Sequence, residues 1–283
     1  MDSPFQPLLL HYKKQEIHYK IVGKGPKWVL ALHGYGETGS AFFALAAELE
    51  QEYRFICPDL PLHGVTSWEK DQPFHPADLA ALVTEWKRIH EIDRLILAGY
   101  SMGGRLASCL VTLSPAAIEE LWLLASDGYH TNPWYWLATQ TATGNRLFRA
   151  TMANPGWLLG LMKAARFLRL LDPVLHKFAL QFLEKEKNRT DLYHRWTFYR
   201  YFRPVKQPLK DALLKEPLFI RQYFGKFDRI IPVSHGKWIT RHLPHLSETI
   251  IFNCGHRLLD PSIVPGIAAA LRTTDPPAMK RPI

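Results

Sequence analysis

The sequence predicts an α/β fold, with a doubly wound, mostly parallel sheet of eight strands and an inserted helical domain. Short apolar runs bounded by turn residues alternate with longer segments in which apolar residues recur at helical spacing. This alternation stops once and later resumes, which predicts an insertion between two halves of one sheet domain. We expect a sheet domain of residues 1–127 and 206–273, a helical cap of residues 128–205, and a flexible tail of residues 274–283.

Six strands are expected before the insertion. Two apolar-rich strands open the chain, and the four largely apolar runs that follow are typical of strands buried on both faces of a parallel sheet. Apolar residues at helical spacing predict helices over residues 39–51 and 76–91. The six expected strands are residues 8–12, 17–22, 28–32, 53–57, 95–98 and 121–125.

The insertion contains no expected buried strand, and it is helical and rich in aromatic residues. After it, two further strands are expected at residues 218–224 and 248–252, and two helices at residues 233–242 and 261–271. Because strands and helices alternate again here, these elements complete the same sheet.

The positive charge of the chain is concentrated in the insertion. The net charge is +9, and the stretch from Gly128 to Lys206 holds 13 Lys or Arg and 4 Asp or Glu, which accounts for the whole imbalance. In the expected helix 157–171, basic residues lie on a different face from the apolar ones. We favour an ordinary cap helix with a solvated basic face. The alternatives are a lid that guides an anionic substrate and a helix that touches an anionic membrane surface.

The composition restricts the remaining function classes. No apolar run reaches transmembrane length, the N-terminus lacks the basic region of a signal peptide, and no metal-ligand or phosphate-loop pattern is present. Three widely spaced cysteines, Cys57, Cys109 and Cys254, indicate reduced thiols rather than a disulfide framework. We therefore expect a cytoplasmic monomer or homodimer with a small-molecule substrate, no nucleic-acid partner, no metal and no cofactor.

The stretch Gly99-Tyr100-Ser101-Met102-Gly103 indicates the chemistry most directly. It follows the strand 95–98 and precedes an expected helix over residues 104–110. A strand, G-x-S-x-G and a helix form the context of a nucleophile elbow, where a sharp turn exposes the serine in a strained conformation. Glycine suits the flanking positions because a side chain there would collide with the neighbouring strand and helix. The N–H groups that begin the helix favour negative charge at the site.

A serine hydroxyl is a weak nucleophile at neutral pH, so it needs a base, and the base needs an orienting acid. Sites in parallel sheets form beyond the carboxyl ends of the strands. His256, among 13 histidines, follows the last strand, and Asp228 follows the strand before it. Asp127, at the end of another strand, is the alternative acid. His33 and His63 flank loops near the expected site, and we expect them to hold loop backbone rather than to transfer protons.

With its motifs in the order nucleophile, acid, histidine, the sequence resembles the α/β-hydrolase superfamily over about the whole chain outside the expected cap and tail. The resemblance implies that Ser101 is the nucleophile, His256 the general base and Asp228 the orienting acid, since Asp228 lies in the family's G-x-x-D-x-x-x-P frame. It further implies an oxyanion hole made by the backbone N–H groups of Tyr35 and Met102. The matching pieces are residues 33–36, 58–64, 99–103, 225–228 and 255–256.

The resemblance implies a serine hydrolase that cleaves a small carboxylic ester or related acyl substrate through an acyl-enzyme. Serine at the nucleophile position argues against the dehalogenase and epoxide-hydrolase branches. The stretch 99–105 also resembles the elbow of the menaquinone-pathway lyases, which eliminate pyruvate from a polyanionic substrate. In that alternative Arg105 would bind substrate carboxylates, whereas otherwise it forms a structural ion pair. A third interpretation, a non-catalytic ligand receptor, conflicts with an intact triad and oxyanion loop.

Overall fold

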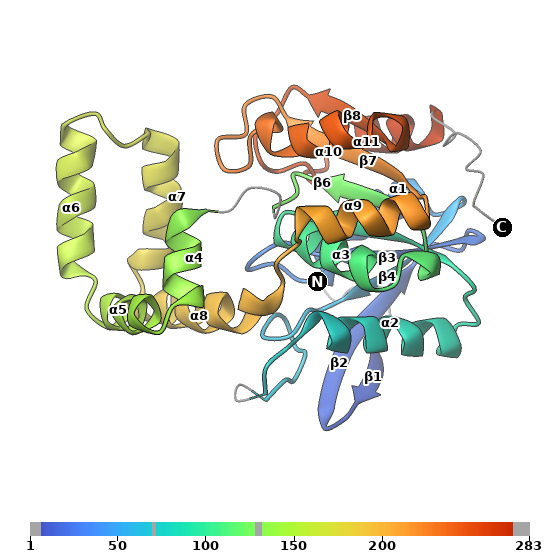
Figure 1. The fold of residues 1–283 in the computed structure, drawn as a ribbon, viewed down its shortest axis with the longest axis horizontal. Helices are drawn as coiled ribbons and strands as arrows, with labels where there is room; N and C mark the ends of the chain where they lie inside the picture. Colours follow the sequence, from blue (N-terminus) through green and yellow to red (C-terminus); the bar gives the residue numbers. More distant parts are fainter. Residues whose placement is uncertain (1–6, 70–71, 128–131, 274–283) are drawn as a thin grey trace. The chain divides into compact units, whose positions relative to one another are not determined.

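The computed structural model describes residues 7–69, 72–127 and 132–273 of the 283-residue chain (Figure 1). Contacts between residues divide the chain into a sheet unit, Met1–His130 with Phe202–Ile283, and a helical unit, Thr131–Tyr201. The helical unit thus begins and ends a few residues inside the expected range 128–205. Phe202 belongs to the sheet unit because its buried ring lies 5.0 Å from the ring of Phe74. The expected tail, residues 274–283, lies outside the described residues.

The eight expected strands are present and form one sheet, in the order β1-β2-β4-β3-β5-β6-β7-β8. β2 pairs antiparallel with β1 and with β4, and all other neighbours are parallel, so the expected α/β fold class is confirmed. The strands are β1 (Leu8–Tyr12), β2 (Gln15–Val22), β3 (Lys27–Leu32), β4 (Tyr53–Pro58), β5 (Leu95–Tyr100), β6 (Ile118–Leu124), β7 (Phe219–Gly225) and β8 (Ser247–Phe252).

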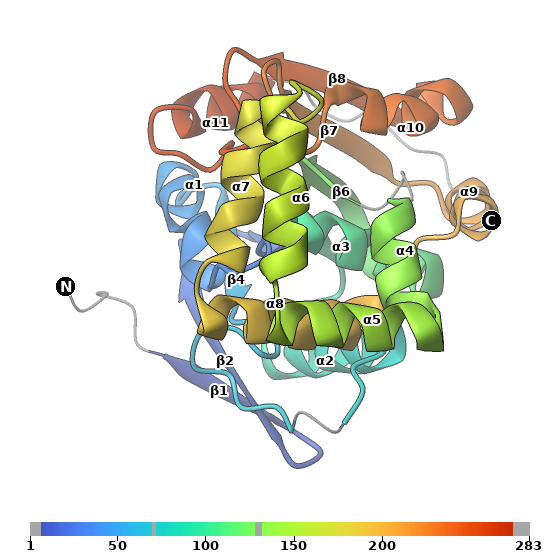
Figure 2. The same ribbon diagram turned by 90° about the vertical axis from the view of Figure 1, so that its left-hand side faces the viewer.

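Helices cover both faces of the sheet, because alternate residues of the central strands point to opposite faces. On one face, Ile96, Ala98 and Tyr100 of β5 join a core with the buried residues of α1 (Phe43–Glu48) and α11 (Val264–Thr273). On the other face, α3 (Met102–Leu113) packs between α2 (Pro76–Ile89) and α9 (Lys206–Lys215) (Figure 2). The central strands are therefore buried on both sides, as their apolar runs predicted.

Some helix boundaries differ from the expected ones. The segments 39–51 and 233–242 each begin with a 3₁₀ turn, Gly39–Phe42 and Val233–Gly236, before α1 and α10 (Lys237–His242). The last helix, α11, begins three residues later than expected. No helix was expected over α9, although its two buried residues, Leu209 and Leu213, are four apart and mark one helical face.

A buried ion network ties the strands whose loops carry the expected acid and base. Arg221 of β7 is 2% exposed and hydrogen-bonds to Glu120 of β6. The same guanidinium donates to Glu248 of β8 at 3.1 Å. Burial raises the pKa of the Glu120 carboxyl, and the positive charge of Arg221 acts in the opposite direction. A buried guanidinium needs such partners, and here they join β6, β7 and β8 to one another.

The helical unit has a core of its own, built from aromatic rings. The ring of Trp196 in α8 lies 5.1 Å from that of Tyr135 in α4 and 5.4 Å from that of Phe148 in α5. α6, in contrast, has no buried residue, and its Trp157 and Leu161 are both more than half exposed. The helices are α4 (Pro133–Gln140), α5 (Ala142–Ala153), α6 (Gly156–Phe167), α7 (Pro173–Leu183) and α8 (Glu186–Phe198). None of the described helices is long and apolar enough to cross a membrane.

Candidate active site

Ser101 is the single residue between β5 and α3, and its backbone has a conformation that residues with a side chain rarely adopt. Its φ is 50° and its ψ is −114°, and such strained conformations cost on the order of 1–3 kcal/mol. Three backbone hydrogen bonds hold it: its N–H donates to Leu124 at 2.9 Å, and its carbonyl accepts from Gly104 and Asp127, both at 3.0 Å. The surrounding backbone therefore forces the serine side chain out at the tip of the turn.

The flanking glycines are required by close contacts on both sides of the turn. A Cβ on Gly99 would lie 2.5 Å from the Cα of Gly104 at the start of α3. A Cβ on Gly103 would overlap the carbonyl oxygen of Leu32, at the end of the neighbouring strand β3. The expected collisions with helix and strand are confirmed at these two positions.

The structure brings the three expected side chains into one hydrogen-bonded line. His256 Nδ1 lies 2.7 Å from Asp228 Oδ2, and His256 Nε2 lies 3.2 Å from Ser101 Oγ. Because an ionised carboxylate only accepts, the proton of the neutral ring is assigned to Nδ1, which leaves Nε2 to accept from the serine. Asp228 is 4% exposed, and its Oδ1 accepts from the N–H groups of Ile230 and Ile231, both at 2.8 Å.

The loops after β7 and β8, which carry Asp228 and His256, are hydrogen-bonded to each other. The N–H of Phe227 donates to the carbonyl of Cys254 at 2.9 Å, and the N–H of Lys226 donates to that of Phe252 at 2.8 Å. A Cβ on Gly225 would overlap the carbonyl of Gly255, so the loops after β7 and β8 lie in contact. This packing fixes the separation of Asp228 and His256.

Asp127, the alternative acid, faces another partner. Its carboxylate lies 3.6 Å from the guanidinium of Arg105, which is 9% exposed. Both side chains therefore belong to an ion pair beside the elbow, and it is Asp228 that contacts the histidine.

The two residues expected to supply oxyanion donors follow neighbouring strands. Leu32 and Gly99 are paired in the parallel β3–β5 register, so the strand ends before Tyr35 and Met102 are adjacent. Met102 is the first residue of α3, where N–H groups lack a partner within the helix and the helix dipole favours negative charge.

His33 and His63 contact backbone, as expected. The Nε2 of His33 accepts from the N–H of Leu60 at 2.9 Å, and its Nδ1 lies 2.8 Å from the carbonyl of Gly34. The Nδ1 of His63 lies 3.0 Å from the carbonyl of Pro61. These contacts position the loops after β3 and β4.

Cys254 lies two residues before His256 but is not poised as a nucleophile. Burial raises the pKa of its thiol, and the negative charges of Asp228 and Asp260 raise it further. Its sulfur is 3.4 Å from the carbonyl of Gly255, to which the protonated thiol donates. Within the described part of the chain, no group of three or more His, Cys, Asp or Glu side chains could hold a metal ion.

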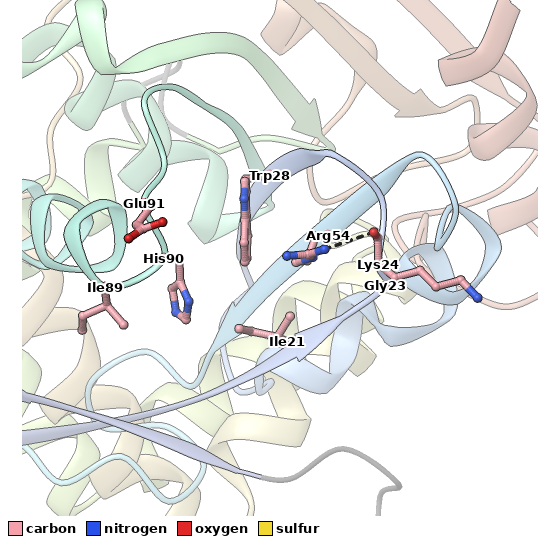
Figure 3. A pocket seen from close by; sticks show the side chains of 8 residues that line it. All are labelled: Ile21, Gly23, Lys24, Trp28, Arg54, Ile89, His90 and Glu91. Carbon is pink, nitrogen blue, oxygen red and sulfur yellow. Dashed lines mark hydrogen bonds between the residues drawn. The ribbon is translucent and has the colours of Figure 1, made fainter.

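An open hollow of about 420 Å³ lies at the opposite end of the sheet (Figure 3). Trp28 and Arg54, at the amino ends of β3 and β4, line it, whereas Ser101 and its partners follow carboxyl ends. The Trp28 ring contacts the guanidinium of Arg54 at 4.8 Å and stacks on His90 at 5.2 Å. This hollow is separate from the candidate active site.

Comparisons with known proteins agree with the fold described above. A family model described as alpha/beta hydrolase fold matches residues 27–261. A serine hydrolase-like protein of Danio rerio is 34% identical over 108 residues, which cover 36% of this chain and 31% of that protein. The chain therefore matches about a third of the length of that relative.

Other matches cover most of the chain. A pimeloyl-[acyl-carrier protein] methyl ester esterase of Nitrosomonas europaea is 25% identical over 260 residues, covering 85% of this chain and 92% of that protein. The crystal structure of a hydrolase from Pseudomonas aeruginosa PA01 superposes with a TM-score of 0.66 at 19% identity, covering 95% of this chain and 98% of that one.

Gly103→Ala should lower the free energy of unfolding by about 1–3 kcal/mol, because the added methyl group forces the elbow away from Leu32. Gly160→Ala in α6 is the matched control, since a Cβ there meets no atom within 4 Å and alanine favours a helix. Denaturant unfolding followed by circular dichroism measures both. Wild-type stability in Gly103→Ala would contradict the packing described for the elbow.

Proposed function

Because the chain belongs to the alpha/beta hydrolase fold family, we propose that it is a serine hydrolase that cleaves a small carboxylic ester through an acyl-enzyme. The observation that carries the proposal is the position of His256, 2.7 Å from the Asp228 carboxylate and 3.2 Å from the Ser101 hydroxyl. Relatives named hydrolases and methyl ester esterases support the choice of an ester.

In the proposed reaction His256 acts alternately as general base and general acid. Nε2 of His256 takes the proton of Ser101 as Oγ attacks the ester carbonyl carbon, and a tetrahedral oxyanion forms. The imidazolium then donates that proton to the alcohol oxygen, the C–O bond breaks, and the acyl group remains on Ser101. Water, activated by the same imidazole, releases the acid and restores the serine.

Asp228 has a supporting role in this proposal. Its Oδ2 holds the Nδ1 proton of His256 and stabilises the imidazolium that forms in each transition state. Two backbone N–H groups at Oδ1 keep the carboxylate in place. The oxyanion would accept from the N–H groups of Met102 and Tyr35, at the start of α3 and after β3.

The hydrolase is preferred to a lyase of the menaquinone pathway on two grounds. Arg105, which that alternative assigns to substrate carboxylates, is buried and paired with Asp127. The relatives reported above are named hydrolases and esterases.

All three cysteines are free of disulfides, which supports the expected cytoplasmic location.

Ser101→Ala should lower kcat for ester hydrolysis by about 10⁴-fold or more while the fold persists, because the residual rate comes from binding and the oxyanion hole alone. A screen of p-nitrophenyl esters of increasing acyl length supplies the substrate, and a fluorophosphonate probe should label the wild type but not the variant. Near wild-type turnover in Ser101→Ala, or labelling elsewhere, would refute the proposal.

Asp228→Asn should lose on the order of 10⁴ in kcat, because an amide at this position no longer fixes the histidine tautomer or stabilises the imidazolium. Asp127→Asn is the matched control, since its carboxylate faces Arg105 and should lose far less activity. Steady-state kinetics of both variants on one ester decide the matter. The reverse ranking would transfer the orienting role to Asp127.

The basic stretch between Gly128 and Lys206 allows a test of how salt affects the hydrolysis of charged esters. If its field guides substrate, kcat/KM for an ester bearing a carboxylate should fall between low and high salt, because the Debye length is only about 10 Å at 0.1 M. A neutral ester of equal size serves as the control and should change little. Equal responses of the two esters would leave this charge as a solvated surface.

A further inference from the structure

Tyr100 connects the elbow to the loop that carries the histidine. Its hydroxyl donates to the backbone carbonyl of His256 at 3.0 Å, and the two rings are 5.5 Å apart. A Cβ on Gly34 would lie 3.2 Å from the same Tyr100 ring. The turn after β3 therefore packs against the same ring that supports His256.

Glu37 binds that turn with both its side chain and its backbone. Its Oε2 accepts from the N–H of Gly34 at 3.1 Å, and its own N–H donates to the carbonyl of Gly34 at 3.4 Å. The carboxylate also lies over the Gly34 Cα, because a Cβ there would be 2.8 Å from Oε2. Gly34 is thus held through both of its peptide groups.

The second of these peptide groups matters for the chemistry. The Gly34 carbonyl and the Tyr35 N–H belong to one planar trans peptide and point in opposite directions. Bonds to that carbonyl, from the backbone N–H of Glu37 and from Nδ1 of His33, therefore set the direction of the Tyr35 N–H. The Glu37 carboxylate holds the peptide group on the other side of Gly34 and so fixes the turn in which these bonds form. Resting on the proposed function, in which that N–H is an oxyanion donor, we infer that Glu37 is a positioning residue for the oxyanion hole.

The environment of the Glu37 carboxyl agrees with this role. Burial raises its pKa, while the Gly34 N–H bond, the imidazolium form of His256 and the guanidinium of Arg257 act in the opposite direction. Its negative charge in turn raises the pKa of Tyr100, which burial already raises. The Gly34 N–H bond thus favours the charged form of this half-buried carboxyl group, which burial disfavours.

The test compares two substitutions of nearly equal size. Glu37→Gln keeps an oxygen that can accept from the Gly34 N–H, whereas Glu37→Met keeps the length of the side chain and cannot accept. We expect kcat to fall about 10–100-fold in Glu37→Met with little change in KM, because an oxyanion donor acts mainly in the transition state. Glu37→Gln should retain kcat within a few-fold of wild type. Glu50→Ala, at an exposed glutamate, controls for loss of a charge.

A second measurement separates positioning from general destabilisation. A trifluoromethyl ketone forms a tetrahedral adduct on the serine, so its affinity depends on the oxyanion hole. Its inhibition constant should rise in Glu37→Met by the factor by which kcat/KM falls, and it should stay near the wild-type value in Glu37→Gln. Should Glu37→Met fail to fold, Glu37→Asp withdraws the carboxylate from Gly34 and should weaken kcat and the inhibitor together.

The outcomes distinguish this inference from the proposed function. An ester that the wild type hydrolyses and Ser101→Ala does not is required first, and its absence counts against the hydrolase itself. Given that ester, equal losses in Glu37→Met and Glu37→Gln, or wild-type kinetics and inhibitor affinity in Glu37→Met, would overturn the positioning role.

Discussion

The sharp reversal of the chain at Ser101 is the constraint on which the site depends. A buried strand ends at Tyr100 and a buried helix begins at Met102, so one residue must make the turn with a φ of 50°. That conformation persists because the ends of β6 and α3 bind the backbone of Ser101 and because Gly99 and Gly103 admit close backbone contacts. The rigid core thus stabilises a half-buried serine in a strained backbone conformation that would not persist on an ordinary loop.

The other site residues follow from the order of strands in the sheet. β5, β6, β7 and β8 are successive parallel neighbours, so the loops that follow them open along one edge. The Arg221 network ties β6, β7 and β8 together, and backbone bonds between the last two loops set the distance from Asp228 to His256. Tyr100 then joins the histidine loop back to the elbow. Each of these contacts involves residues far apart in the chain.

The aromatic and apolar residues of the helical unit fall into two groups, one packed inside the unit and one not buried. Tyr135, Phe148 and Trp196 pack against one another and stabilise the unit from within. The apolar residues of α6 are not used in this way, since none of them is buried. Along the chain, this unit is inserted between β6 and α9.

Much of this architecture was determined by local sequence pattern. Eight apolar runs indicate eight strands, and the strand–glycine–serine–glycine–helix pattern indicates Ser101. The rule that sites form after parallel strands indicates His256 and two candidate acids, Asp228 and Asp127. These features are recognisable because burial on both faces of a sheet and a one-residue turn each demand a particular residue pattern. The sequence does not predict α9, because only Leu209 and Leu213 mark its buried face.

The tertiary structure alone decided which side chains meet. Asp127 and Asp228 both follow strands, and only the packing of loops placed one against His256 and the other against Arg105. Glu37 carried no sequence signal, because its bond to Gly34 depends on how a short turn folds over the Tyr100 ring. Periodicity reports which face of an element is buried, whereas the partner of a polar side chain depends on contacts between distant segments.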